Sequence, residues 1–149
     1  MIRVEDRVSL RLQADEAFAT LTDFTRLPEW DPGIARVTRC DSGPLRLGST
    51  FDVVARFAGR DVPMRYEVEA FDPALREATL VGRASGIRAT DFIHVLPRGD
   101  HSEVHWRAEF QLLGARRLLA PLMRPLFHRL AAKAMNGLRA HLGESPRNL

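Results

Sequence analysis

The stretch Gly114–Leu142 near the end of the chain constrains the fold more than any other feature. Its apolar residues recur at helical spacing, it carries only positive charge, and it follows a long run of strand-like sequence. Such a stretch is typical of a helix with one buried face. We therefore expect one long C-terminal helix that an antiparallel sheet curls around, and we expect the function to lie in the space between them.

The predicted helix has an apolar face and a basic face. Pro121 and Pro125 each remove a backbone donor, so we expect the helix to be kinked or to begin properly only near Pro125. A basic amphipathic helix can lie on an anionic membrane, but we favour the simpler interpretation that its charged face is solvated. The predicted apolar face comprises Leu118, Leu119, Leu122, Met123, Leu126, Phe127, Leu130, Ala131 and Ala134.

The range Ile34–Phe110 consists of short alternating runs separated by turn residues. The clearest run, Glu103–Leu112, places apolar side chains such as Trp106 on one face and polar side chains on the other. A period of two with one polar face indicates antiparallel strands with one side in water. Val4–Leu12 follows the same pattern, and Ala14–Phe24 then changes to helical spacing.

Composition and charge limit the class of protein. A chain of 149 residues with 45% apolar and 28% charged residues is typical of one globular domain. We place that domain at residues 1–143 and expect residues 144–149 to form a frayed tail. The net charge of +3 is too small to indicate nucleic-acid binding. No apolar run is long enough for a membrane span and the N-terminus lacks a signal-peptide core, so we expect a cytoplasmic protein.

The sequence contains none of the common motifs for metal binding, nucleotide binding or covalent catalysis. The histidines lack the spacing of a zinc site, and there is no phosphate loop, nucleophile elbow or dinucleotide fingerprint. The single cysteine, Cys40, has no cysteine or histidine neighbours at metal-binding spacing. We therefore predict no metal and no cofactor.

One cluster has a characteristic spacing: Asp23, Pro28 and Trp30 in the run D-F-T-R-L-P-E-W, followed by Asp31-Pro32. Together with the stretches named at the end of this paragraph, it resembles the START-like superfamily that includes the birch pollen allergen. More narrowly, it resembles the bacterial branch of polyketide cyclases/dehydrases and lipid-transport proteins. The likeness covers nearly the whole chain and departs from the family at Asp100-His101-Ser102, where a glycine and then a threonine are common. The further stretches are Ala14, Phe18, Leu47-Gly48-Ser49, Tyr66-Glu67-Val68, Asp72-Pro73 and the closing helix up to Leu138.

The resemblance implies an α+β helix-grip fold, in which a curved antiparallel sheet of about seven strands wraps the C-terminal helix. Two short helices are expected between strands 1 and 2. The resemblance also implies an elongated cavity that binds a lipid, a polyketide or a similar hydrophobic small molecule. We expect no nucleic-acid partner, we do not favour peripheral membrane contact, and we leave monomer and homodimer open. The predicted lining is Phe51, Val53, Phe57, Met64, Tyr66, Val68, Trp106, Phe110, Met123 and Phe127.

The alternative hypothesis is a polyketide cyclase or dehydratase that uses acid–base residues in the same cavity. Asp91 and His94 are the catalytic candidates, because they lie in a mostly apolar strand. They have opposite parity, so only one of them faces inward, where desolvation moves its pKa toward neutrality. The parity of this strand is ambiguous in the sequence, and the choice between the two stays open.

Several residues near the predicted cavity have structural interpretations as well as functional ones. Tyr66 either bonds the protein through its hydroxyl or offers the cavity a polar group that orients a ligand. Trp30, with Pro28, either locks the short helices against the sheet, which we favour, or gates the cavity. Trp106 either packs in the core, which we favour, or stacks on a ligand. Asp23 is expected to cap the turn that follows it.

Overall fold

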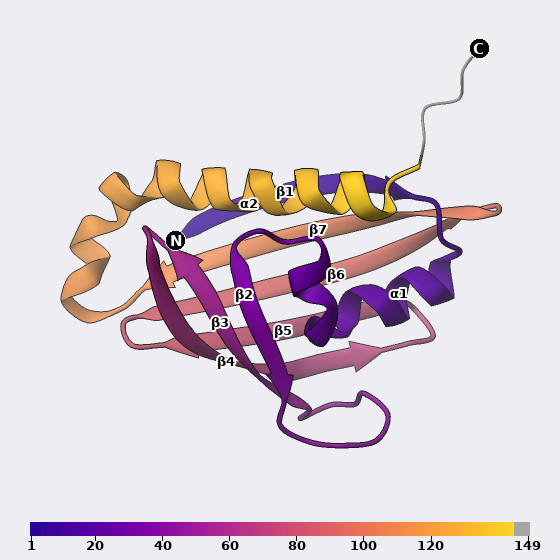
Figure 1. The fold of residues 1–149 in the computed structure, drawn as a ribbon, viewed down its shortest axis with the longest axis horizontal. Coiled ribbons are helices and arrows are strands. Elements are labelled where there is room, and N and C mark those ends of the chain that lie inside the picture. The colour runs from indigo at the N-terminus through magenta and orange to yellow at the C-terminus, as the bar shows by residue number, and fades with distance from the viewer. Residues whose placement is uncertain (145–149) are drawn as a thin grey trace, which may run out of the picture.

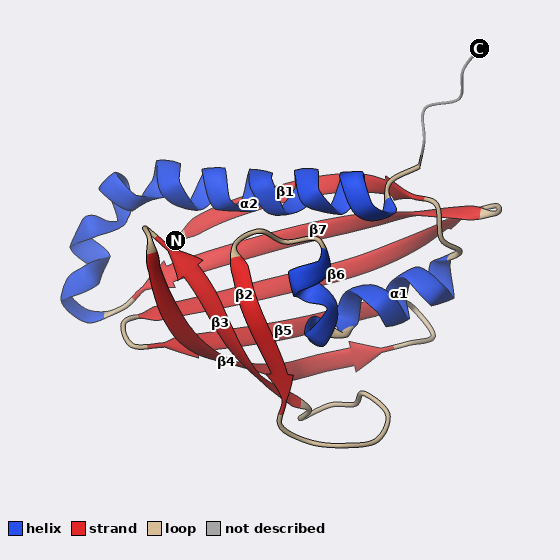
Figure 2. Cartoon of the chain, viewed as in Figure 1, coloured by secondary structure: helices blue, strands red, loops and turns tan. Residues whose placement is uncertain are grey.

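The computed structural model describes residues 1–144. It contains one antiparallel sheet, short helices near its start, and a long C-terminal helix (Figures 1 and 2). The predicted α+β helix-grip fold is confirmed. The elements are β1 (Ile2–Leu10), α1 (Ala14–Thr22), η1 (Phe24–Glu29), β2 (Ile34–Arg39), β3 (Thr50–Phe57), β4 (Arg60–Asp72), β5 (Glu77–Ala84), β6 (Ile87–Arg98), β7 (His101–Leu112), η2 (Gly114–Leu119) and α2 (Ala120–Leu142).

The sheet has the strand order β1-β7-β6-β5-β4-β3-β2, and every neighbouring pair is antiparallel. The segment with α1 and η1 carries the chain from one edge strand, β1, to the other, β2. The sheet curves so that β2, β3 and β4 cross in front of the other strands, and α2 lies along β1 and β7 (Figure 1). The inner face of this curve is therefore enclosed by α1, η1 and α2.

Buried apolar side chains of the inner face form the core. Along β7, for example, Val104 and Trp106 are buried, while the alternate positions Glu103 and His105 are more exposed. Burying a large aliphatic or aromatic side chain contributes roughly 1.5–3 kcal/mol. Most of the buried residues form one cluster, and a second, smaller cluster of Ile2, Leu112 and Phe127 lies at the end of the sheet nearest η2.

The N-terminal helices follow the pattern predicted for them. The apolar residues Phe18 and Leu21 of α1 are buried, and Phe18 stacks on Phe71 of β4 with ring centroids 5.6 Å apart. Asp23 caps η1 as predicted, because its carboxylate accepts a hydrogen bond from the backbone N–H of Thr25 at 3.1 Å. These contacts hold α1 and η1 on the inner face of the sheet.

The C-terminal helix does not begin near Pro125, which was the expected alternative to a kink. The 3-10 helix η2 ends at Leu119 and the α-helix begins at Ala120, earlier than the alternative start near Pro125. Pro121 lies in the first turn of α2. Backbone N–H groups in the first turn have no carbonyl partner within the helix, so a proline there costs no helical hydrogen bond. Pro125 lies inside the helix.

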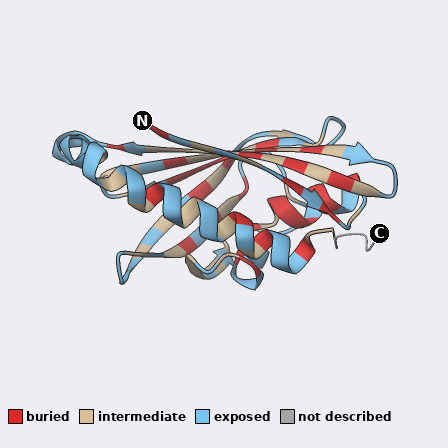
Figure 3. Ribbon diagram, turned by 90° about the horizontal axis from the view of Figure 1, so that it is seen from above, coloured by how far each residue is buried: buried red, intermediate tan, exposed pale blue. Residues whose placement is uncertain are grey.

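The prediction that Leu118, Leu119 and Leu122 belong to a buried face is wrong. Leu118 and Leu122 are each 78% exposed and Leu119 is 48% exposed. The physical reason is that the core does not extend to this end of the helix, since the first buried residue of α2 is Phe127. Figure 3 shows this exposed end at η2 and the start of α2.

A close contact joins α2 to the loop after η1. Gly137 of α2 lies directly against the backbone of Trp30, and a Cβ at position 137 would collide with the Trp30 carbonyl oxygen. Trp30 in turn packs edge-on against Trp106, with ring centroids 5.6 Å apart. The missing side chain of Gly137 thus lets the helix seat on the loop that carries Trp30 and Asp31.

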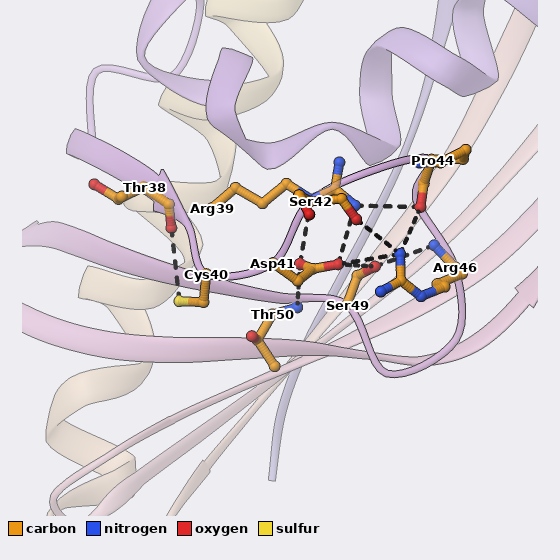
Figure 4. Close-up of polar contacts among 9 residues, drawn as sticks. All are labelled: Thr38, Arg39, Cys40, Asp41, Ser42, Pro44, Arg46, Ser49 and Thr50. Carbon is orange, nitrogen blue, oxygen red and sulfur yellow. Dashed lines mark hydrogen bonds and ion pairs between the residues drawn. The ribbon is translucent and has the colours of Figure 1, made fainter.

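The loop between β2 and β3 is organised around Asp41 (Figure 4). The Asp41 carboxylate forms an ion pair with Arg39 at 3.1 Å and accepts hydrogen bonds from the Ser49 hydroxyl at 3.0 Å and the Thr50 backbone N–H at 3.3 Å. These donors, Arg39 first, lower the pKa of Asp41 to about 2. The network fixes the path of the loop and is remote from the space under α2.

The two ends of the described chain meet. The backbone N–H of Arg11 donates to the carbonyl of Leu142, and that of Glu144 donates to the carbonyl of Ser9, each at 3.0 Å. Glu144, the first residue of the predicted tail, is thus bonded to β1, and the rest of that tail lies outside the described residues. Among residues 1–144, none of the helices is long and apolar enough to cross a bilayer.

Candidate ligand cavity

A cavity of about 160 Å³ lies between the inner face of the sheet and α2. The wall from α2 is apolar and consists of Phe127, Leu130, Ala131, Ala134 and Met135. The opposite wall comes from β1, β3, β4, β6 and β7, and η1 with the loop after it closes one end. Arg56 of β3, which is exposed to solvent, also lines the cavity.

The predicted lining residues divide into two groups. Phe51, Val53 and Val68 are fully buried in the main core, outside the cavity lining. The reason is that η1 covers their end of the sheet, since its residue Phe24 packs on Phe51 with ring centroids 5.8 Å apart. Met123 packs against the smaller cluster, also outside the lining. The predicted residues that line the cavity are Phe57, Met64, Tyr66, Trp106, Phe110 and Phe127.

Asp91 faces the cavity, and His94 does not. The register places Asp91 between Leu80 and Ala108 on the inner face. His94 pairs with Glu77 and His105 on the outer face, 3.6 Å from the Glu77 carboxylate. The ambiguous parity of β6 is therefore resolved by its neighbours.

The Asp91 carboxylate is held by one neutral donor. The indole N–H of Trp106 donates to Asp91 Oδ1 at 2.9 Å. Burial raises the pKa of Asp91 to about 6, and the nearby carboxyl of Asp31 contributes to the rise, while the Trp106 bond opposes both effects. A carboxyl group with this pKa can both accept and return a proton near neutral pH.

Asp31, which was not among the predicted site residues, lines the same cavity from the loop after η1. The backbone N–H of Gly33 donates to Asp31 Oδ1 at 2.8 Å. Burial raises the pKa of Asp31 to about 6. The signal for it in the sequence is its position in the Asp31-Pro32 step that follows the family-like cluster ending at Trp30.

Tyr66 belongs to the core cluster and lines the cavity together with the two acids. It is 8% exposed. Its ring lies so close to Gly82 that a Cβ on Gly82 would collide with the ring. The Phe24 ring packs edge-on against it, with ring centroids 5.2 Å apart. Within residues 1–144 its hydroxyl makes no hydrogen bond to the protein, and Tyr66 lines the cavity. Burial first, then Asp91 and Asp31, raise the pKa of Tyr66 well above its ordinary value, so the hydroxyl keeps its proton.

Two tryptophans form the polar end of the cavity with these groups. Trp30 is buried, lines the cavity and packs against Trp106, whereas Pro28 is exposed. Trp106 directs its N–H to Asp91 and presents its ring to the lining. Both rings therefore have a packing role and a position beside the cavity.

One further acid lies at the rim. Asp6, which breaks the apolar alternation of β1, lines the cavity and pairs with Arg139 of α2 at 2.8 Å. Among the described residues, no group of histidine, cysteine, aspartate and glutamate side chains is arranged to hold a metal ion.

Sequence and structure comparisons agree with this architecture. The family model for polyketide cyclases/dehydrases and lipid transport matches residues 1–143. The chain belongs to this family. The family predicted from the Asp23–Trp30 cluster is thereby confirmed. No curated protein matches the sequence.

Several solved structures are similar to this family member. The Thermus thermophilus protein TTHA0849 has 16% identity and a TM-score of 0.74, with 94% of each chain covered. The ZhuI aromatase/cyclase from Streptomyces sp. R1128 has 16% identity and a TM-score of 0.66, with 92% of this chain and 93% of that one covered. A START superfamily protein from Mycobacterium smegmatis has 15% identity and a TM-score of 0.71, with 93% and 92% covered. At these identities the likeness concerns the fold.

Proposed function

We propose that this protein binds a hydrophobic small molecule in the cavity between the sheet and α2. The observation that carries the proposal is the cavity itself, whose lining is apolar except at the end with Asp31, Tyr66 and Asp91 and at the rim. Cavities lined mainly by apolar side chains with a few placed polar groups are typical small-molecule sites. The family, which includes lipid-transport proteins, supports the same class of function.

The volume limits the size of the ligand. An engineered apolar cavity of about 150 Å³ accommodates benzene, and the cavity here is about 160 Å³. It therefore suits a molecule of about one ring with a short substituent. A longer lipid or polyketide would have to extend out of the cavity into solvent or move α2.

The test is calorimetric and thermal-shift titration with small neutral aromatic compounds, together with native mass spectrometry of the freshly purified protein. Ala131→Leu places a larger side chain in the cavity and is expected to abolish binding. Ala132→Leu is the matched control, because the neighbouring position is exposed and lies outside the lining. Absence of any bound lipophile, or equal binding by both variants, would contradict the proposal.

A second candidate function is acid–base catalysis of cyclisation or dehydration in the same cavity. The observation that favours it is Asp91, a cavity-facing carboxyl with a pKa of about 6 near the protonated hydroxyl of Tyr66. Asp91 would remove a proton from a carbon beside a carbonyl, and Tyr66 would donate a hydrogen bond to the oxygen where charge develops. The similar aromatase/cyclase structure has the same fold.

This candidate predicts different effects for the two residues named from the sequence. Asp91→Asn is expected to reduce turnover of an aromatic polyketide precursor by about 10²- to 10⁴-fold, as is usual for loss of a general base. His94→Gln is the control, since His94 lies on the outer face of β6. Equal turnover by both variants would remove Asp91 from the mechanism.

A further inference from the structure

The polar end of the cavity contains two carboxyl groups from distant parts of the chain. Asp31 follows η1 and Asp91 lies in the middle of β6, and both line the cavity beside the packed pair Trp30 and Trp106. One oxygen of each carboxylate accepts a hydrogen bond, from Gly33 N–H and Trp106 N–H respectively. The second oxygen of each carboxylate forms no hydrogen bond with the described residues.

Tyr66 gives independent support for a ligand at this end of the cavity. Its hydroxyl belongs to a side chain that is more than nine-tenths buried, lines the cavity, and makes no hydrogen bond within residues 1–144. Buried polar groups in proteins nearly always have a partner. The phenol and the two free carboxylate oxygens therefore offer three polar contacts to one occupant.

The charges around the cavity are unbalanced. Its ionisable lining groups are Asp6, Asp31, Arg56, Tyr66 and Asp91. Asp6 is neutralised by Arg139, and Arg56 is exposed to solvent. Asp31 and Asp91 form no ion pair with a basic side chain in the described part of the chain, and the wall from α2 is entirely apolar.

Carboxylates in such surroundings are unfavourable unless a cation or a proton joins them. We propose that the cavity selects small apolar amines, whose ammonium group lies between Asp31 and Asp91 beside the Tyr66 hydroxyl and whose ring lies against Phe110 and Phe127. An ammonium group has three donors, which match the free oxygens of the two carboxylates and the phenol. The inference rests on the proposed function, because it assigns a ligand class to the same cavity.

The test compares 2-phenylethylamine with its neutral isostere 2-phenylethanol, by calorimetry at about pH 7.5. Both have one ring and a short substituent, and they differ in the charged group. We expect the amine to bind about tenfold more tightly or better, as charge-assisted hydrogen bonds are stronger than neutral ones. Asp31→Asn and Asp91→Asn should each reduce this advantage, and the double variant should remove it.

The controls separate loss of charge from loss of the cavity. Unchanged affinity of the Asn variants for 2-phenylethanol shows that the cavity is intact. Asp61→Asn removes an exposed carboxylate in the β3–β4 hairpin and should leave the preference for the amine unchanged. Lowering the pH from about 7.5 to about 5 should also diminish the preference, because Asp31 and Asp91 then bind protons, and this pH dependence should vanish in the double variant.

The outcomes distinguish the two proposals. Binding of 2-phenylethanol without any preference for the amine overturns the amine inference and leaves the proposed function standing. A preference that survives in the double Asn variant also overturns it. If neither compound nor any other small aromatic molecule enters the cavity, the proposed function fails and the inference fails with it.

Discussion

At the scale of single residues, Asp91 is the buried carboxyl group on which the catalytic proposal and the amine proposal both depend. Its neighbours across the sheet, Leu80 and Ala108, are apolar, and its one donor among the described residues is Trp106. Burial among such neighbours disfavours the charged form, which is why its pKa rises to about 6. The charge of Asp91 is therefore one that the folded protein carries at a cost in stability.

This cost predicts a pH-dependent effect of Asp91→Asn. The native state holds the Asp91 proton more tightly than the unfolded state, so stability falls as the pH rises from 3.8 through about 6. Asparagine has no charge to bury, and its amide oxygen can keep the Trp106 bond. We expect the variant to be more stable by up to roughly 3 kcal/mol at about pH 8 and nearly unchanged at about pH 4.

Urea denaturation at both pH values measures the effect. The control is Asp61→Asn, which removes a carboxylate from an exposed position. A difference of the same size at both pH values would show that the substitution acts through packing and not through ionisation.

At the scale of elements, the position of α2 depends on the absence of a side chain at Gly137. The helix approaches the Trp30 carbonyl so closely that any Cβ there would collide with it. Trp30 and Asp31 are adjacent, so the same contact sets where the polar end of the cavity lies beneath the helix. The exposed leucines of η2 and early α2 lie outside this docked part.

Gly137→Ala is therefore expected to destabilise the protein, by roughly 1–3 kcal/mol, because the helix or the Trp30 loop must shift. This reverses the ordinary effect of helix propensity, by which alanine is better than glycine by about 1 kcal/mol. Ala140→Gly, at an exposed position of the same helix, is the control and should lose about 1 kcal/mol. Thermal and urea unfolding measure both, and a stabilised Gly137→Ala variant would rule out the close contact.

At the scale of the whole molecule, the fold closes by joining its last helix to its first strand. Leu10 and Leu142 are buried, and the backbone bonds of Arg11 and Glu144 tie the two ends of the described chain together. The core therefore depends on contacts between segments at opposite ends of the sequence. The first buried residue of this helix is Phe127.

This division of α2 predicts opposite outcomes for two leucines. Leu138 is fully buried in the main cluster, so Leu138→Ala should lose roughly 2–5 kcal/mol of unfolding free energy. Leu122 is 78% exposed, so Leu122→Ala should change stability by no more than about 0.5 kcal/mol. Urea denaturation of both measures the difference, and a large loss at Leu122 would mean that another surface covers it.

The order of elements was predictable because it depends on local periodicity. Alternation in runs such as Glu103–Leu112 identifies a strand from its own residues, and the change of period at Ala14 identifies a helix. The same inward parity led to Tyr66, Trp106 and Phe110 as residues that face the helix. Resemblance around Asp23–Trp30 then supplied the helix-grip arrangement.

The site itself was decided by tertiary structure. In the sequence, Asp91 and His94 are equally good candidates for the residue that faces the cavity. The pairing of β6 with β5 and β7 is what places Asp91 on the inner face. Asp31 joins the site because Gly137 admits its loop beneath α2, a contact that no local pattern contains. Leu118 and Leu122 follow a helical apolar pattern but stay exposed. Periodicity identifies the face of a helix that can be buried, whereas the extent of the sheet determines which part of that face is buried.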